Sequence, residues 1–394
     1  MRGIDLIVLS LVLVFILGYL VLNPGILQYV IQGINGIIKS INYTGIPSNL
    51  SSVVITGPCM TYLVIPINAK SGEALFLDSV SNSLRSYLLT SDEYSAWSPP
   101  SAPLNYVYSL NGSGVVIWQL STGNYDLVLC GQSIANSVSY RVLRYDGMGV
   151  SAVHGYNNTA IATNTVVGFF NITNASILNS SGIPNGFSLQ LNVYIAVNSD
   201  GQVTYHWFQN ALVVSGNYYW FQGEVDVTHY IGSSQSINYV NGVCTSGCFE
   251  TPMAGYLIIT VRNTGNGAVV MFGYSITRLG NITFNNPGIN WFAQYPIPNA
   301  QAEIVVSPEI GPYGWPLDAE FVIAGPGNGG GVEFESLNAT LALYYWNGTS
   351  LVPFPRTYSF AISTAEYAVN VHVTPMGPGT AELTVGPNNY EEWG

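Results

Sequence analysis

Charged side chains are scarce in this sequence. Only 8% of the 394 residues are Asp, Glu, Lys or Arg, against about a quarter in ordinary soluble proteins. The nine Lys and Arg residues are scattered and the formal net charge is −12, so we expect no nucleic acid partner. The polar surface must then consist of Asn, Ser, Thr, Gln and Tyr, whose state changes little when carboxylates become protonated. That composition favours a protein that works in acid.

The motifs of several enzyme classes are also missing. There is no Gly-x-Ser-x-Gly elbow of a serine hydrolase and no His-Glu-x-x-His pattern, and the four histidines lie far apart. The glycine-rich run Gly325–Gly331 lacks the Lys-Ser or Lys-Thr of a phosphate-binding loop, so it is either a plain loop or the rim of a cleft. We therefore expect no metal and no cofactor. Any hydrolytic chemistry would have to come from carboxyl groups.

Cysteine is rare but present in an even number. In an exported protein, four cysteines predict two disulfides, for which we favour Cys59–Cys130 and Cys244–Cys248 among three possible pairings. No histidine or further cysteine lies near Cys244 and Cys248, which argues against a zinc site. Ten Asn-x-Ser/Thr sequons agree with an extracellular location and predict N-glycans.

One long apolar run, Leu6–Leu22, lies near the start of the chain. We expect it to form a hydrophobic helix that anchors the protein in a membrane, with Arg2 inside and the body outside. Two alternatives stay open, a cleaved signal peptide and pilin-type processing after Gly3 that would place the run in a filament core. The next segment, residues 23–50, carries an amphipathic pattern and reads as a stalk or a short helix packed on the domain.

The body of the chain reads as β-structure. Residues 51–145 form an N-terminal β region in which Asp78–Tyr94 could be a helix, residues 146–375 form a second β domain, and 376–394 are a tail. In the second part, short apolar runs recur every ten to fifteen residues with Pro and Gly between them. This pattern predicts an all-β fold, an antiparallel sandwich or paired sandwiches, with no helix apart from the N-terminal one.

The clearest strands lie in the stretch Phe187–Thr228. Five apolar residues alternate with polar ones from Leu189 to Val197, which predicts a strand with one buried and one wetter face. Asp200-Gly201 has the composition of a tight hairpin turn, after which two more strands follow up to Thr228. Three antiparallel strands at the centre of a large sheet are expected here.

Six blocks of the sequence stand in a characteristic order: Met148-Gly149, Ser188–Val193, Tyr205–Asn210, Tyr218–Phe221, Asp318–Gly329 and Leu337–Gly348. In these blocks the sequence resembles the thermopsin family, the secreted acid peptidases of heat- and acid-loving archaea. The resemblance covers roughly residues 145 to 375. It implies an extracellular endopeptidase that acts on unfolded protein or peptide at acid pH.

Three pairs of acids at spacing two place both carboxyls on one strand face: Glu224/Asp226, Asp318/Glu320 and Glu333/Glu335. Such spacing leaves roughly 6.5–7 Å between the two residues, which is loose for sharing a proton, so a partner from another strand would be needed. A solvated strand edge is the ordinary alternative for each pair.

The thermopsin resemblance singles out three candidate catalytic residues. Asp318 and Glu320 match the acids before the family's Gly-Pro-Gly loop, and Glu366 matches an acid of a later segment, in which Ser363 and Ala365 replace the family's Asp and Gly. One carboxyl would activate water and the other would protonate the leaving amine. The rival hypothesis is a non-catalytic surface protein for adhesion, cell-wall assembly or a filament.

Overall fold

The computed structural model describes most of the chain after the N-terminal fifty residues. The chain divides into two units, Met1–Val53 and Val54–Gly394, and only the second unit is described below. The predicted anchor helix and stalk lie outside the described residues. Within them, no helix is long and apolar enough to cross a membrane. The described residues are 59, 62–70, 73–79, 81–99, 101–131, 138–144, 147–227, 229–234, 238–240, 243–277 and 288–394.

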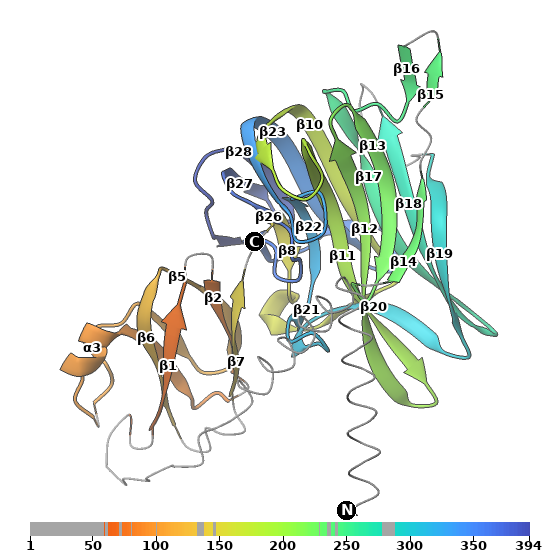
Figure 1. Ribbon diagram of the computed structural model, residues 1–394. Helices are drawn as coiled ribbons and strands as arrows, with labels where there is room; N and C mark the ends of the chain where they lie inside the picture. The colour runs from red at the N-terminus through yellow and green to blue at the C-terminus, as the bar shows by residue number, and fades with distance from the viewer. Residues whose placement is uncertain are drawn as a thin grey trace, which may run out of the picture. The chain divides into compact units, whose positions relative to one another are not determined.

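Two large sheets form the body after residue 147 (Figure 1). Their ladders are antiparallel, apart from a short parallel pairing of β23 with β26. The nine-stranded sheet has the order β19-β18-β17-β10-β23-β28-β27, and β24 and β26 both pair with β23. Its strands are β10 (Thr165–Ser180), β17 (Met253–Thr264), β18 (Gly267–Thr277), β19 (Asn290–Pro298), β23 (Gly331–Trp346), β24 (Leu351–Pro353), β26 (Tyr367–Ala368), β27 (Val371–Gly377) and β28 (Thr380–Val385).

The eleven-stranded sheet holds the candidate acids. Its order is β14-β13-β12-β11-β22-β8-β25-β29, and β20 pairs with β11, β21 and β9. The strands are β8 (Met148–Ala152), β9 (Ile161–Thr163), β11 (Gly186–Ser199), β12 (Gln202–Ser215), β13 (Tyr218–Val225), β14 (His229–Ser234), β20 (Gln301–Ile310), β21 (Pro316–Leu317), β22 (Ala319–Ala324), β25 (Thr357–Phe360) and β29 (Glu392–Trp393).

One face of each large sheet packs against the other to form the main core. Alternate residues of β11, from Leu189 to Ile195, are fully buried in the same apolar cluster as Leu257 and Ile259 of β17. Ring contacts cross between the sheets, for example Phe221 stacked on Tyr274 with 3.7 Å between centroids. The predicted all-β antiparallel fold is therefore confirmed, and the opposite face of the eleven-stranded sheet is left for the polar residues.

The predicted hairpin after β11 is confirmed. Ser199 pairs with Gln202, so the loop has two residues, and both Asp200 (φ 52°) and Gly201 (φ 82°) adopt positive φ. Two such residues in a two-residue loop make a turn whose twist matches that of the strands. The third strand, β13, ends at Val225, earlier than expected, because Asp226 and Val227 also take positive φ and leave the ladder.

Residues 62–144 form two smaller sheets. One has the order β1-β6-β3-β4 and the other β5-β2-β7. The disulfide Cys59–Cys130 lies in this region and confirms the first predicted pairing. Cys248 is also disulfide-bonded, and the side chain of Cys244, its expected partner, lies outside the described residues. The elements are β1 (Tyr62–Ala69), β2 (Glu73–Ser79), β3 (Arg85–Thr90), α3 (Ser91–Ala96), β4 (Tyr108–Asn111), β5 (Gly114–Leu120), β6 (Gly123–Cys130) and β7 (Val138–Arg144); elsewhere in the chain lie η2 (Tyr156–Asn158), β15 (Asn238–Val240) and β16 (Val243–Ser246).

The helix considered over Asp78–Tyr94 is wrong. This stretch contains the end of β2, all of β3 and only the start of α3. Four consecutive residues of β3, from Ser86 to Leu89, are buried, so both faces of the strand are covered. A strand buried on both faces loses the alternation that distinguishes it from a helix.

Candidate active site

A row of polar residues crosses the eleven-stranded sheet on the face away from the main core. Glu320 of β22 is the cross-strand partner of Asn192 on β11, Asn192 is the partner of Gln209 on β12, and Gln209 is the partner of Glu224 on β13. On the other side, Glu320 pairs with Ser151 of β8. Because directly opposed residues of a sheet point to the same face, these side chains lie side by side.

This face of the sheet is buried, whereas the alternation from Leu189 to Val197 predicted that it would be the wetter face. Gln190, Asn192 and Tyr194, the polar positions of β11, are at most 2% exposed. What covers them includes residues 361–366, which we call the covering segment and whose side chains and backbone bond to the row. Each buried polar group here therefore needs a hydrogen-bond partner within the protein.

Glu320 is fully buried and accepts three N–H donors. Its Oε1 accepts the backbone N–H of Ile362 and that of Ser363 (2.7 Å), and its Oε2 accepts from Asn192 Nδ2 at 3.0 Å. Two of these donors belong to the covering segment. Hydrogen bonds from N–H groups stabilise the negative charge of a carboxylate. Both oxygens of Glu320 receive such bonds.

Asp318, just before β22, is fully buried beside Glu320. Its Oδ1 accepts from Ser363 Oγ at 3.0 Å, whereas no partner is recorded for Oδ2 among the described residues. Burial, then the charge of Glu320 and a hydrogen bond to Glu320, raise the pKa of Asp318 well above its ordinary value. Two ionised carboxyls in such a place would repel each other. The site therefore disfavours a negative charge on Asp318.

The spacing argument for these two acids assumed that both stand on one strand. Asp318 stands outside β22, which begins at Ala319. The regular strand repeat therefore does not set the distance between the two carboxyls.

Glu366 joins the same network through side-chain amides and a hydroxyl. Its Oε2 accepts from Thr364 Oγ1 at 2.9 Å and from Gln190 Nε2 at 3.3 Å. Thr364 Oγ1 is also 2.6 Å from Gln190 Oε1, and Gln209 Nε2 donates to both Gln190 Oε1 (3.2 Å) and Asn192 Oδ1 (3.1 Å). The structure therefore connects Glu366 to Glu320 through neutral side chains.

The glycine-rich loop also meets this network. The backbone N–H of Gly329 donates to Glu366 Oε1 at 3.1 Å. Glu366 is partly exposed, in contrast with Asp318 and Glu320. The loop thus borders the part of the network that lies nearest to solvent.

Of the other two predicted acid pairs, one residue, Glu224, lies in the polar row of the candidate site. Burial and the charge of Glu366 raise the pKa of Glu224, while a hydrogen bond from Gln222 Nε2 lowers it. Glu333 and Glu335 lie on β23 of the other sheet, where Glu335 is exposed and accepts from Ser176 Oγ at 3.0 Å. Glu335 fits the ordinary role of a solvated strand residue.

The part of the chain that carries the candidate site is similar in sequence to known proteins. Residues 135–228 and 222–371 match the family model described as Thermopsin. The thermopsin of Sulfolobus acidocaldarius is 30% identical over 267 residues, with 58% of this chain and 77% of that protein covered. The chain belongs to the thermopsin family. All three candidate acids fall within the family match, and membership in the thermopsin family supports a peptidase-type function in general.

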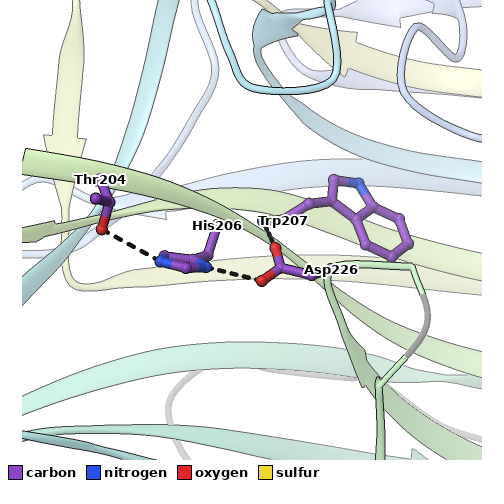
Figure 2. Close-up of polar contacts among 4 residues, drawn as sticks. All are labelled: Thr204, His206, Trp207 and Asp226. Carbon is purple, nitrogen blue, oxygen red and sulfur yellow. Dashed lines mark hydrogen bonds and ion pairs between the residues drawn. The ribbon is translucent and has the colours of Figure 1, made fainter. Parts of the chain in front are cut away.

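A second polar cluster of this thermopsin-family chain lies at the end of β13 (Figure 2). His206 Nδ1 is 2.8 Å from Asp226 Oδ2, the backbone N–H of Trp207 donates to Asp226 Oδ1 at 3.1 Å, and Thr204 Oγ1 is 3.2 Å from His206 Nε2. The hydrogen bond to Asp226 raises the pKa of His206, although burial opposes this. Bonds from His206, Trp207 and Tyr313 outweigh burial and lower the pKa of Asp226.

Tyr194 is close enough to both this cluster and the buried acids to feel their charges. Burial, followed by the charges of Asp318 and Glu320 and more weakly of Asp226, raises the pKa of Tyr194 above its ordinary value. Its hydroxyl is buried, as is the Nε1 of its cross-strand partner Trp207, and no partner is recorded for either atom among the described residues. Sequence reasoning missed Tyr194, Gln190 and Asn192 as site residues. The only signal was their period of two on β11.

Proposed function

We propose that this protein is an endopeptidase that hydrolyses unfolded protein in acid, with Asp318 and Glu320 as its acid and base. The observation that supports this most is that both acids are fully buried and both are bonded by Ser363, because two carboxyls in different states supply a general acid and a general base. Among the described residues, no group of three His, Cys, Asp or Glu side chains is placed to hold a metal ion. The proposal accordingly assigns the chemistry to carboxyls alone.

The surroundings of the two carboxyls support a division of roles. Glu320 accepts three N–H groups, which suits it to act as the base, whereas burial and the charge of Glu320 raise the pKa of Asp318, which suits Asp318 to act as the acid. In the proposed reaction Glu320 takes a proton from water as the water oxygen bonds to the peptide carbonyl carbon. Asp318 then gives its proton to the amide nitrogen as the C–N bond breaks. One proton enters and one leaves the pair, so the starting state is restored when Glu320 returns its proton to Asp318.

Asp318 Oδ2 and the Tyr194 hydroxyl are the polar atoms that this reaction would use first. Both are buried and have no recorded partner among the described residues. A buried polar atom without a partner costs free energy and marks a place where a water or ligand group can bind. A neutral tyrosine hydroxyl there would donate to the oxygen of the carbonyl under attack.

In the proposed reaction the covering segment moves aside to admit the substrate. Its hold on the site consists of the bonds from Ile362 and Ser363 to Glu320, from Ser363 to Asp318 and from Thr364 to Gln190. We assign Glu366 to the rim of the opened site, where it is partly exposed and bonds to both Thr364 and the glycine-rich loop. Glu366 is the third carboxyl of the proposed site.

Hydrolysis of a denatured protein tests the proposal. The purified chain should cut reduced, carboxymethylated protein at about pH 3 far faster than at about pH 7, and a metal chelator should have no effect. A rate that collapses on chelation would overturn the carboxyl mechanism. No cleavage at either pH would favour the non-catalytic surface protein instead.

We further propose that the body lies outside the cell, tethered by Leu6–Leu22 and carrying N-glycans. The Cys59–Cys130 disulfide supports an oxidising compartment, because such bonds persist where thiols are not kept reduced. Cell fractionation and deglycosylation of the native protein test this. Recovery in the soluble cytoplasmic fraction without a shift in mass on deglycosylation would refute it.

A further inference from the structure

A pocket lies on the outer face of the nine-stranded sheet, the sheet that does not carry the acids. Its volume is about 260 Å³. That is just below the usual range of small-molecule sites and suits a fragment of one or two residues. Ten residues line it: Thr165, Val167, Tyr256, Ile258, Thr260, Arg262, Ile289, Trp291, Trp346 and Leu351.

Most of the residues that line the pocket are aromatic or aliphatic. Val167 and Ile258 are cross-strand partners on β10 and β17 and form a small apolar cluster with Tyr256 on this face. The side chains of Ile289 and Trp291 are 37% and 39% exposed, which leaves apolar surface open to a ligand. Exposed apolar surface in a concave site is typical of a binding site.

The ring of Trp291 lies against the backbone of Gly273. Gly273 pairs with both Ile258 and Trp291, and a Cβ at Gly273 would lie 2.8 Å from the Trp291 ring. The carbonyl of Gly273 also accepts Asn210 Nδ2 at 2.8 Å. The Trp291 ring therefore lies directly on a stretch of backbone that the Asn210 side chain bonds, and this side of the pocket is already formed without a ligand.

The polar lining narrows the choice of ligand to one with an anionic end. Thr165 Oγ1 and Thr260 Oγ1 are 2.7 Å apart, and Thr260 also donates to the Asn164 carbonyl, so these hydroxyls are already engaged. Arg262 is exposed and has no hydrogen bond or ion pair among the described residues. An unpaired guanidinium is suited to a carboxylate, to which it can make two parallel hydrogen bonds.

We propose that this pocket binds the C-terminal residue of a peptide, with an apolar, preferably aromatic, side chain between the tryptophans and the terminal carboxylate on Arg262. The occupied hydroxyls disfavour an oligosaccharide, which needs many free hydrogen-bonding groups. Arg262, an unpaired cation among the described residues that line this largely apolar pocket, matches one carboxylate next to one apolar side chain. This binding is independent of whether Asp318 and Glu320 hydrolyse peptides.

Calorimetric titration with N-acetyl-glycyl-phenylalanine and with its C-terminal amide tests the proposal. The free acid should bind at least ~10-fold more tightly than the amide at about pH 6, because only the acid forms a charge-assisted bond. Below about pH 3 the difference should vanish, since a terminal carboxyl is then protonated while arginine stays charged. Intact probe after the titration is confirmed by mass spectrometry.

Two variants assign the contacts. Arg262→Gln should bring the acid down to the affinity of the amide, and Trp291→Ala should weaken both ligands by about 3- to 10-fold. Arg85→Gln, which changes an exposed arginine on β3, is the matched control and should change nothing. Equal binding of acid and amide to the wild-type protein would overturn the proposal. So would Arg262→Gln without effect, or displacement of the peptide by a neutral oligosaccharide.

Discussion

Ser363 bonds both Asp318 and Glu320: its hydroxyl donates to Asp318 Oδ1 at 3.0 Å and its backbone N–H donates to Glu320 Oε1 at 2.7 Å, and neither acid has any solvent exposure. Ionising both would place two negative charges in contact in a dry site, which is strongly unfavourable. The pair is therefore most stable when one carboxyl is protonated and the other is ionised. That state is favoured in acid, where the proposed peptidase would work.

Asp318→Asn should change how stability depends on pH. The folded pKa of Asp318 is raised, whereas an unfolded Asp has a pKa of about 3.9. Between about pH 3.9 and the folded pKa, the folded state binds one more proton than the unfolded state. The contribution of Asp318 to stability is therefore fully present below about pH 3.9 and falls as pH rises above it, by up to about 1.4 kcal/mol per pH unit. Urea unfolding between about pH 3 and pH 7 should show a shallower fall in the variant.

The control for this experiment is Asp92→Asn, which changes an exposed acid in the first turn of α3. It should leave the slope as in the wild type. If Asp318→Asn and Asp92→Asn had the same slope, Asp318 would not hold a proton in the folded protein.

Thr364→Val should loosen the covering segment. The substitution keeps the shape but removes the hydroxyl that bonds Gln190 Oε1 and Glu366 Oε2. Because Gln190 is buried, losing a partner should lower the free energy of unfolding by about 1–3 kcal/mol. Thr374→Val, at an exposed position of β27, is the control and should cost less than ~0.5 kcal/mol. Equal losses in the two variants would show that the Thr364 hydroxyl does not hold the segment.

Loss of the Cys59–Cys130 disulfide should destabilise the two smaller sheets. The bond closes a loop with a sequence separation of 71 residues. The chain-entropy relation gives about 4 kcal/mol for a loop of that length. A Cys59→Ala/Cys130→Ala double variant should therefore unfold at lower denaturant concentration. An unchanged midpoint would mean that this region gains nothing from the cross-link.

His206→Asn should lower stability only within a limited pH interval. The folded pKa of His206 is raised, so its contribution is present below the ordinary value of about 6.5 and is lost as pH rises through the folded pKa. The folded pKa of Asp226 is lowered, so its contribution is lost as pH falls through that value. Because His206 is 39% exposed, the pair should contribute less than about 1 kcal/mol.

Thermal unfolding at about pH 5 and about pH 9 measures this effect. The wild type should exceed His206→Asn in stability at the lower pH more than at the higher pH. His229→Asn, at an exposed position of β14, should show no such dependence. An equal difference at both values would rule out the ion pair as its cause.

The strands were predictable where one face is apolar and the other polar. The alternation from Leu189 to Val197 and the Asp200-Gly201 turn determine the β11–β12 hairpin, since a shift by one residue would bury the wrong side chains. The alternation could not reveal that the polar face would also be buried. That depends on residues 361–366, more than 160 positions away in the chain, which local periodicity does not encode.

For the site, the sequence could indicate the acids but not their relation. Asp318 and Glu320 stood out through the thermopsin resemblance, yet the strand repeat could not give the distance between their carboxyls, since Asp318 lies just outside β22. Tyr194 and Gln190 were invisible as site residues because nothing in a β-strand pattern distinguishes a buried polar face from a solvated one.

The most direct test of the proposed function is the rate at which Glu320→Gln hydrolyses a denatured protein in acid. Glutamine keeps the shape of the side chain and removes its proton chemistry, so the rate should fall at least ~100-fold. Glu335→Gln, an exposed acid of β23, should retain the wild-type rate. Near-ultraviolet circular dichroism establishes that both variants are folded. A folded Glu320→Gln protein with an undiminished rate would contradict the assignment of Glu320 as the base and place the reaction elsewhere in the chain.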